Sequence, residues 1–388
     1  MDSQPLTPAP QTAPTPEISG AADISGPFRI TVHPSLAQAE PGWRRLQETG
    51  ICYGFQTYEW LSAWQSLHGD PEGVLPAIVQ VCAGTSEDPV MVVPLGVYRK
   101  HGLKILSFLG GWLTDYHAPL LSPHFAKSIT PSAFRELWER VRGLLPAMDY
   151  IHFWRMPERV EDVPNPFVHM QGAVSNEFTH FSKLPPTYEE FLLRRSKKVN
   201  NISRRKRDNL QKIGPIVFSF ATTPEEIATT MDALVRQKSR RHMETTSADP
   251  YASNPRLRQF YEQLLNTGKA NPRGILSRVT VNGEVVATLW AFIHRKWFLS
   301  ILSGFEVGKW GRYSPGVIMK EELIRWCIAT GLDVFDLTVG DEAYKADWTE
   351  ITMPVFVYHK PVTLLGAGYR AAILLRQTAK RALAPFRR

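Results

Sequence analysis

Cysteine is scarce in this sequence, and long hydrophobic runs are missing. Three cysteines, Cys52, Cys82 and Cys327, are scattered over 388 residues without C-x-x-C spacing, which supports neither a disulfide framework nor a zinc knuckle. A reducing, cytoplasmic compartment is the simplest expectation. No apolar run reaches the roughly 18 residues that a membrane-spanning helix needs, and the first residues lack the basic start and apolar stretch of a secretory signal.

Patterns of metal ligands are missing as well. His101, His117, His152, His242 and His294 show neither i, i+4 nor H-x-H pairing, so we expect no metal cofactor. The cysteines form no evident Cys–His arrangement that would indicate a covalent mechanism. What remains is an ordinary globular composition, with 43% hydrophobic and 21% charged residues and a net charge of +8. The length predicts two or three domains.

Composition divides the chain into four segments. Residues 1–26 are rich in Pro, Ala, Ser and Thr and poor in large apolar residues. Burial of so few apolar groups cannot offset the entropy lost on ordering, so we expect this segment to be disordered. We then expect an N-terminal lobe over 27–183, a C-terminal lobe over 184–360 and a basic amphipathic tail over 361–388.

Both lobes show mixed strand and helix patterns. In the first lobe, the apolar runs 77–82 and 90–97 flank a polar turn and predict a hairpin, and residues 131–145 predict a helix. In the second lobe, Asn282-Gly283 between two apolar runs is a strong hairpin signal. The other elements expected in the second lobe are helices from Thr187 and over 224–238, 255–267 and 316–330, and strands over 216–220, 297–302, 334–337 and 354–358.

A glycine-rich segment, Gly304 to Gly316, precedes the helix expected over 316–330. Glycines and a serine before a helix leave backbone N–H groups unpaired, and together with the helix dipole these groups suit a phosphate or pyrophosphate. The candidate residues are Arg312, Tyr313, Ser314, Pro315 and Gly316, with Arg312 adding a charged contact. The alternative is an ordinary helix start, in which Ser314 caps the helix and Pro315 takes its first position.

A polar loop follows the strand expected over 334–337. It contains Asp341, Glu342, Tyr344 and Lys345, which are groups that donate or accept protons, and loops at strand ends often carry function. Lys345 is a candidate to hold a carbonyl or an oxyanion, and Asp341 or Glu342 is a candidate base. The alternative is a salt-bridged loop without a catalytic role.

Eight basic residues fall within the 14 positions from 194 to 207. Like charges on one helix destabilise it unless they are compensated, which favours an anionic ligand such as a nucleotide sugar, a lipid diphosphate, a CoA phosphate or tRNA. Arg194, Lys198 and Arg204 are the candidate contacts for such a ligand. The alternative is a solvated helix face.

The tail is basic and partly apolar. No acidic residue follows Glu350, and cations such as Arg370 and Arg376 are interspersed with leucines. A basic amphipathic helix can lie on an anionic membrane surface, so residues 362–388 are a candidate for peripheral membrane contact. The alternative is a helix that docks on the rest of the protein.

Several of these residues stand in a specific order along the chain. The order is Tyr313-Ser314-Pro315-Gly316, a helix, Phe335-Asp336-Leu337, and then Gly340-Asp341-Glu342-x-Tyr344-Lys345 with Trp348. This series resembles the acetyltransferase-like domain of the GNAT superfamily. More specifically, it resembles the branch of CelD-type proteins of cellulose biosynthesis, which is related to the Fem-type peptidoglycan aminoacyltransferases.

The resemblance extends over residues 28–360. The segment from Phe191 to Leu210 resembles the basic helix that opens the acetyltransferase-like domain. In the first lobe, Leu113-Thr114-Asp115-Tyr116 resembles the short Ser-Asp-Tyr motif of the family, so Asp115 and Tyr116 are candidate substrate contacts.

The resemblance implies an α/β fold of two tandem GNAT-like lobes, each a mixed, mainly antiparallel sheet flanked by helices. It implies that an acyl-CoA lies across a splayed pair of central strands, with 285–293 as the central strand. The pyrophosphate would bind at 313–316, and the acyl carbon would lie in the same cleft beside Lys345. The segment 309–316 stands in place of the family's Arg/Gln-x-x-Gly-x-Gly/Ala loop, which keeps an aminoacyl-tRNA donor as an alternative.

We therefore expect an N-acyltransferase that moves an acyl group from acetyl-CoA or another acyl-CoA to an amine. The resemblance implies a small-molecule or glycan-precursor acceptor, such as a sugar nucleotide or an envelope-polysaccharide precursor, in the cytoplasm or at the inner face of the membrane. One alternative is a Fem-type ligase with aminoacyl-tRNA as its partner. Another is a non-catalytic accessory protein of polysaccharide synthesis.

Overall fold

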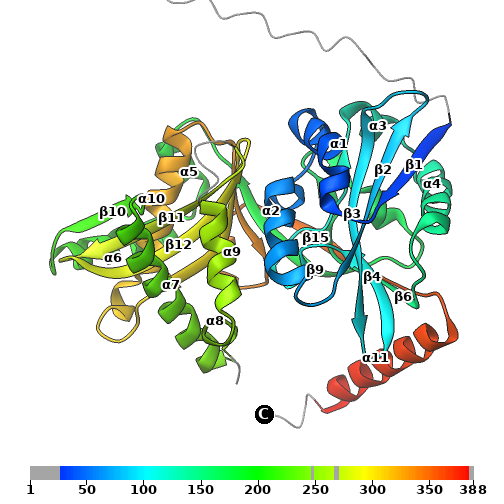
Figure 1. Cartoon of the computed structure of the whole chain (residues 1–388). Coiled ribbons are helices and arrows are strands. Elements are labelled where there is room, and N and C mark those ends of the chain that lie inside the picture. Colours follow the sequence, from blue (N-terminus) through cyan, green and yellow to red (C-terminus); the bar gives the residue numbers. More distant parts are fainter. Residues whose placement is uncertain (1–26, 246–248, 266–270, 384–388) are drawn as a thin grey trace, which may run out of the picture.

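The computed structural model describes residues 27–245, 249–265 and 271–383. The segment expected to be disordered, 1–26, lies outside the described residues, as do the last five residues of the basic tail. Within the described residues, thirteen strands join into one sheet that runs through both halves of the chain (Figure 1). Helices flank this sheet, which confirms the expected mixed α/β fold.

The strand order places the two halves of the chain side by side. From one edge the order is β1-β2-β3-β4-β6-β15-β9-β14-β13-β12-β11-β10, and β5 pairs with β3. Among the described strands, β4 with β6 and β13 with β14 are the parallel neighbours, and the remaining neighbours are antiparallel. The sheet is therefore mainly antiparallel, as expected.

The first half begins with an antiparallel meander. Its strands are β1 (Phe28–His33), β2 (Leu75–Ala83), β3 (Pro89–Lys100), β4 (Leu103–Phe108), β5 (Leu120–Leu121) and β6 (Tyr150–Pro157). Its helices are α1 (Leu36–Thr49), α2 (Tyr58–Trp64), α3 (Pro123–Ser128) and α4 (Pro131–Leu144), and β7 (Arg159–Val160) pairs with β8 (Val163–Pro164) in a small separate sheet. The predicted hairpin is β2–β3, and the helix predicted over 131–145 is α4.

The second half alternates between helices and strands. Its helices are α5 (Tyr188–Arg194), α6 (Lys197–Gln211), α7 (Pro224–Thr245), α8 (Pro250–Ser253), α9 (Pro255–Leu265), α10 (Pro315–Ala329) and α11 (Leu364–Leu383). Its strands are β10 (Ile216–Phe220), β11 (Arg273–Val281), β12 (Glu284–His294), β13 (Trp297–Phe305), β14 (Val334–Val339) and β15 (Ile351–Pro361). The predicted Asn282-Gly283 turn joins β11 to β12, and both residues have the positive φ that this two-residue turn requires.

Two strands interlock the halves at the centre of the sheet. The strand β9 (Val174–Lys183) pairs with β14 on one side and with β15 on the other. The strand β15 returns from the second half to pair with β6 of the first. The strand β9 is not among the predicted elements, because its polar sequence lacks the alternation of a half-buried strand. The position of β9 is decided by pairing on both sides.

A shared aromatic core joins the two halves. Trp60 on α2 packs edge-to-face against Phe260 on α9, with ring centroids 5.0 Å apart, and against Phe292 on β12 at 5.1 Å. All three side chains are fully buried. Because the apolar faces of both halves are buried in one cluster, packing holds their relative placement.

The basic helix expected from Phe191 to Leu210 is in fact two helices. The helix α5 ends at Arg194, Arg195 has an extended backbone, and α6 begins after Ser196, whose hydroxyl accepts from Val199 N. Ser196 favours a helix N-cap over a helix interior, because its hydroxyl can satisfy one of the free amides of a new helix. The basic tail forms α11, and among the described residues no helix is both long and apolar enough to cross a bilayer.

Candidate active site

The strands β13 and β14 separate after a short parallel contact. In the described chain they pair only over Trp297–Leu299 and Val334–Asp336. On β13 the register with β12 shifts between Ser300 and Leu302, which leaves Ile301 as a bulge. A bulge re-aims the backbone beside it, and bulges are frequent next to active sites. The splayed pair is therefore β13–β14 and does not include the strand expected over 285–293, because that strand, β12, is paired on both sides.

Two adjoining cavities lie at this opening. The first, here called the helix-end cavity, has a volume of about 350 Å³ and is lined by Gly311, Ser314 and Gly316 at the start of α10. The second, here called the interlobe cavity, has a volume of about 270 Å³ and is lined by residues of both halves, including Asp115 and Lys345. Four side chains line both cavities: Lys238, Ser303, Glu342 and Tyr344. The start of α10 and Lys345 thus line neighbouring cavities that share these four side chains.

The start of α10 lacks a side-chain cap. Ser314 takes the N-cap position with a φ of 53°, a left-handed conformation that is uncommon for serine, and its hydroxyl does not bond to the helix. Elsewhere, Ser35 caps α1 and Thr130 caps α4 through their hydroxyls. Because free amides at a helix start need a partner, an uncapped start that faces a cavity is suited to an anionic ligand.

The other residues predicted for the pyrophosphate site lie around the helix-end cavity rather than on its wall. Pro315 is buried at the first position of α10. The guanidinium of Arg312 lies 4.8 Å from the ring centroid of Tyr313, and neither side chain is part of the cavity lining. The structure thus brings Ser314 and Gly316 to the cavity and leaves Arg312 at its exposed rim.

Lys320, which is not among the predicted site residues, lines the helix-end cavity. Lys320 Nζ is 3.4 Å from Gly316 O and 4.5 Å from the ring centroid of Tyr344, and it forms no ion pair with a described residue. Burial lowers the pKa of Lys320 to about 8. Lys238 and Arg241 line the same cavity, and burial, followed by the charge of Arg241, lowers the pKa of Lys238. This collection of cations favours an anionic ligand.

Lys345 bonds to the segment that contains the predicted catalytic residues. Its ammonium donates to Thr338 O at 3.1 Å and to Val339 O at 2.9 Å, and lies 3.1 Å from Glu342 Oε2. The side chain is 3% exposed. Burial raises the pKa of Glu342, but the ammonium of Lys345 outweighs it and holds that pKa below its usual value. Lys345 therefore fixes the loop and keeps Glu342 ionised at the boundary of the two cavities.

The remaining members of the predicted catalytic group differ in their placement. Tyr344 lines both cavities, and burial raises the pKa of its phenol to about 12, so the phenol keeps its proton. Asp341 is exposed and is not part of the lining of either cavity.

The first lobe contributes Asp115 to the interlobe cavity. Its carboxylate is paired with Arg155 Nη1 at 2.7 Å, and both side chains line the cavity. Arg155 has a positive φ of 48°, a strained conformation that is often found at functional sites. Tyr116, the other predicted substrate contact, is fully buried and is not part of the lining.

Tyr116 belongs to a buried network that connects the two lobes. Its hydroxyl donates to the carboxylate of Asp336 on β14, which also accepts from Trp297 Nε1 at 2.9 Å and from Thr338 N at 2.7 Å. Burial raises the pKa of Asp336 to about 6, and these donors oppose that rise. Thr338 in turn offers its carbonyl to Lys345. The network thus runs from the first lobe to the candidate catalytic loop.

The basic cluster is docked beside α10, and its predicted contacts line neither the helix-end cavity nor the interlobe cavity. Arg194 donates to Lys183 O at 2.9 Å, Arg204 donates to Asn201 Oδ1 at 3.2 Å, and Lys198 is exposed. Lys206 donates to the carbonyl of Arg312. Arg207 is paired with Glu321 and Glu322 of α10, so the exposed cations of α6 are Lys197, Lys198, Arg204 and Arg205.

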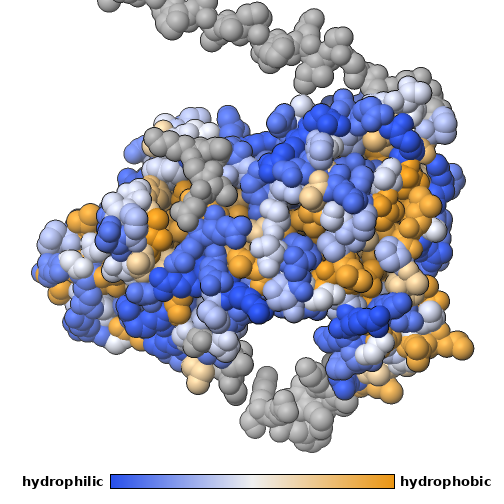
Figure 2. Space-filling view, in the orientation of Figure 1, coloured by the Kyte–Doolittle hydropathy of each residue, from blue (hydrophilic) through white to orange (hydrophobic). Residues whose placement is uncertain are grey.

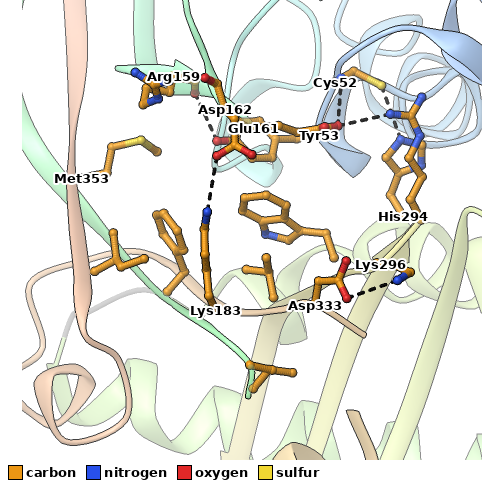
Figure 3. Close-up of a pocket in the computed structure, with 16 residues that line it drawn as sticks. Cys52, Tyr53, Arg159, Glu161, Asp162, Lys183, His294, Lys296, Asp333 and Met353 are labelled. Atoms are coloured by element: carbon orange, nitrogen blue, oxygen red, sulfur yellow. Dashed lines mark hydrogen bonds and ion pairs between the residues drawn. The ribbon is translucent and has the colours of Figure 1, made fainter. Parts of the chain in front are cut away.

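A third and larger cavity, of about 660 Å³, lies at the other end of β13 and β14 (Figure 3). Figure 3 shows Lys183 reaching across it toward Asp162, and the two form an ion pair at 3.5 Å. Trp297, whose indole contacts Asp336, lies on its wall. The third cavity shares no lining residue with the interlobe cavity or the helix-end cavity.

The third cavity also contains a Cys–His pair that the sequence did not reveal. Cys52 Sγ lies 3.5 Å from His294 Nε2, although the residues are 242 positions apart. Burial raises the pKa of Cys52 to about 12 and lowers that of His294 to about 3. Both groups are therefore neutral, and a neutral thiol is a poor nucleophile.

Comparisons with known proteins bear on this arrangement. Residues 196–346 match an acetyltransferase (GNAT) domain. The match includes the start of α10, Lys320 and the loop that holds Lys345. No protein of curated function matches the sequence significantly. Among the described residues, no group of three or more His, Cys, Asp or Glu side chains could hold a metal ion.

Two solved structures share the fold over most of the chain. FemX superimposes with a TM-score of 0.58 at 10% identity, over 85% of this chain and 97% of that one. A conserved protein of unknown function from Bacteroides thetaiotaomicron superimposes with a TM-score of 0.53 at 10% identity, over 85% of this chain and 99% of that one. At this identity the likeness concerns the fold alone. The protein has the mixed α/β fold with a mainly antiparallel sheet that the sequence predicts, but one sheet runs through both halves instead of a separate sheet in each, and the GNAT match lies in the second half.

Proposed function

We propose that this protein transfers an acyl group from an acyl-CoA to an amine. The observation that carries the proposal is the cleft between β13 and β14, which runs from the uncapped start of α10 to the loop of Lys345. One end of this cleft is suited to an anion and the other to a polar acceptor. A transferase must hold its donor and its acceptor in line, because this positioning supplies much of the rate enhancement of the transfer reaction.

The donor occupies the helix-end cavity in this proposal. The start of α10 binds the diphosphate, and Lys320 and Lys238 neutralise its charge. The pantetheine arm then follows the open edge of β13, and its thioester lies near Ser303 and Tyr344, which line both cavities. The uncapped helix start and the cations on the cavity wall support a donor with phosphate groups.

The chemistry is a direct aminolysis of the thioester. The amine nitrogen attacks the carbonyl carbon, the carbon–sulfur bond breaks, and CoA leaves as a thiolate. Glu342 accepts the proton that the amine loses, and Tyr344 offers a proton to the thiolate. Backbone N–H groups at the bulge of β13 stabilise the oxyanion. Lys345 acts through the loop that it holds rather than on the carbonyl itself, because its three contacts are all within the protein.

The acceptor occupies the interlobe cavity in this proposal. The carboxylate of Asp115 suits an ammonium or hydroxyl group, and Arg155 suits a phosphate or carboxylate. Trp112 and Tyr251 offer aromatic faces beside these charges, which suits a sugar ring. We infer an amino group on a polar carrier such as a sugar nucleotide or a polysaccharide precursor, in line with the resemblance to CelD-type proteins.

A second candidate is a Fem-type ligase with an aminoacyl-tRNA donor. The observation in its favour is the exposed basic surface of α6, which Lys206 connects to the start of α10. A tRNA backbone would add many phosphates along such a surface, and its binding would weaken steeply with salt. Acetyl-CoA binding inside the cleft would show a much weaker salt dependence.

A ligand screen on the full chain separates these functions. We expect acetyl-CoA or a longer acyl-CoA to raise the unfolding temperature, and amine acceptors to release the CoA thiol in a colorimetric assay. Stabilisation by charged tRNA alone would instead establish the Fem-type function. Binding of acyl-CoA without thiol release, over a broad amine panel that includes amino sugars and their nucleotides, would show an accessory protein that has lost turnover.

A further inference from the structure

The helix α11 presents an apolar face that no described residue covers. Leu364 is 92% exposed, Leu365 is 69% exposed and Leu375 is 71% exposed. Gly368, Ala371 and Ala372 lie between them on the same side of the helix, at the spacing that places residues on one helical face. Figure 2 shows hydrophobic residues on the outer side of this helix, at the lower right of the view. The molecule thus carries an outward hydrophobic stripe, defined here as the α11 face.

The opposite side of α11 is firmly seated on the first lobe. The hydroxyl of Thr363 accepts from Gly366 N and donates to Asp149 Oδ1 at 2.9 Å. Gly366 lies so close to the backbone of Asp149 that a side chain there would collide with the carbonyl. Tyr369 packs edge-to-face on Tyr150, with centroids 5.3 Å apart. The leucines point outward because the opposite side of the helix is held by the first lobe. The α11 face is thus already formed before any partner binds.

The tail that contains this face carries charge of one sign. No acidic residue follows Glu350 in the sequence, the exposed Arg376 flanks the stripe on the helix, and four more Lys and Arg residues follow between 380 and 388. Leucines next to cations are the composition of helices that lie in the interface of an anionic bilayer. The apolar face enters the acyl region while the cations stay with the phosphates.

We propose that the α11 face docks on the surface of an anionic lipid bilayer. A second copy of this chain is the competing occupant, but a symmetric contact through α11 would bring together two helices that carry cations and no acidic residue. A bilayer with anionic lipids neutralises the same charges and buries the same leucines. This proposal is independent of the proposed transferase activity.

The location of α11 fits such docking. The helix lies along the lower edge of the first lobe, far from α6 and from the outer strands of the second lobe (Figure 1). Its contacts in the described chain are with the first lobe and β15. A bilayer at this edge would leave the start of α10 free for its ligand.

Vesicle flotation with the full chain tests the proposal. We expect the protein to float with phosphatidylcholine vesicles that contain about 30% phosphatidylglycerol, and to remain behind with phosphatidylcholine alone. Raising NaCl from about 0.05 M to about 0.5 M should release it. The triple substitution L364S, L365S and L375S should weaken binding by at least about tenfold. The matched control is Leu193→Ser, because Leu193 on α5 is 84% exposed and lies outside the α11 face.

A fluorescent label keeps the test decisive even if the triple variant unfolds. The native cysteines are all buried, so a polarity-sensitive maleimide should report on Leu375→Cys alone. We expect a blue shift on addition of anionic vesicles, and none for Leu193→Cys. Wild-type protein that ignores anionic vesicles, or a triple variant that is folded and binds equally well, would overturn the proposal. The proposal would also be overturned if the triple substitution abolished a concentration-dependent dimer. It would equally be overturned if the blue shift of the Leu375→Cys label occurred without lipid.

Discussion

The hydroxyl of Tyr116 lies 2.8 Å and 2.9 Å from the two carboxylate oxygens of Asp336, although the residues are 220 positions apart and belong to different lobes. This bond is buried at the centre of the sheet. Asp336 also holds Thr338, whose carbonyl accepts from Lys345. The first lobe therefore supports the candidate catalytic loop of the second, and the sequence motif that contains Tyr116 has an architectural role beside the cleft.

Tyr116→Phe should destabilise the protein without enlarging a cavity. The substitution removes the donor to a buried carboxylate, and we expect the free energy of unfolding to fall by about 1–3 kcal/mol in urea denaturation. The matched control is Tyr188→Phe, because the Tyr188 hydroxyl is buried and has no hydrogen-bond partner among the described residues. Equal stability of the two variants would contradict the network described here.

Asp336 should make the stability of the protein depend on pH in a defined direction. Burial raises its pKa to about 6 in the folded state, from the 3.8 of an ordinary aspartate. Below about pH 4 the carboxyl is protonated in both states, and as the pH rises to about 6 the unfolded state loses its proton first. The stability that the protonated Asp336 carboxyl adds to the folded state is present below about pH 4. This contribution to the free energy of unfolding therefore falls by about 3 kcal/mol as the pH rises from 4 to 6. The difference in unfolding free energy between wild type and Asp336→Asn should decline from pH 4 to pH 6, and parallel profiles would contradict this.

Lys345→Met should impair turnover far more than donor binding. The loop loses the cation that joins Thr338, Val339 and Glu342, so we expect thiol release to slow by at least about 10²-fold. The affinity for acetyl-CoA, measured by calorimetry, should change by less than about threefold, because Lys345 does not line the helix-end cavity. Lys296→Met, which removes an exposed cation on another turn, is the control and should retain activity. A Lys345→Met enzyme with wild-type turnover would remove this loop from the mechanism.

Lys320 should couple donor binding to pH. Its pKa of about 8 means that the free protein loses this charge as the pH rises, while a bound phosphate favours the protonated form. The affinity for acetyl-CoA should therefore fall by about tenfold between pH 7 and pH 9. Lys320→Arg keeps its charge over this range, so its pH profile should be flat. The same slope in wild type and Lys320→Arg would exclude Lys320 as the phosphate contact.

Gly316→Val should block the start of α10. A Cβ at Gly316 would already lie 3.3 Å from the Phe305 ring, and the branched side chain would extend into the helix-end cavity. We expect acetyl-CoA to bind at least about tenfold more weakly in calorimetry. Gly143→Val on α4 is the matched control, because a Cβ at Gly143 meets no atom within 4 Å. Unchanged affinity in Gly316→Val would refute a phosphate site at this helix.

Short-range features of this protein could be predicted well from its sequence. The Asn282-Gly283 hairpin and the helix after Ser314 depend on neighbouring residues and form where expected, whereas the expected loop from Gly340 to Lys345 runs into a short 3₁₀ helix, Ala343–Asp347. The break at Arg195–Ser196 was missed, although Ser196 was a visible capping signal. Lys320 could also have been found, because it follows Gly316 by one helical turn and therefore faces the same cavity.

By itself, the sequence determined the chemistry available to this protein: the glycine-rich helix start, the Glu342–Lys345 loop and a basic tail without acidic residues. Only the tertiary structure decided which of these groups are accessible. It placed Tyr116 under the cleft instead of inside it, brought Cys52 to His294 as an inert pair, and made Lys345 a support of its loop. The physical reason is that burial and pairing set the charge and reach of a side chain, and both depend on strands that meet across the whole length of the chain.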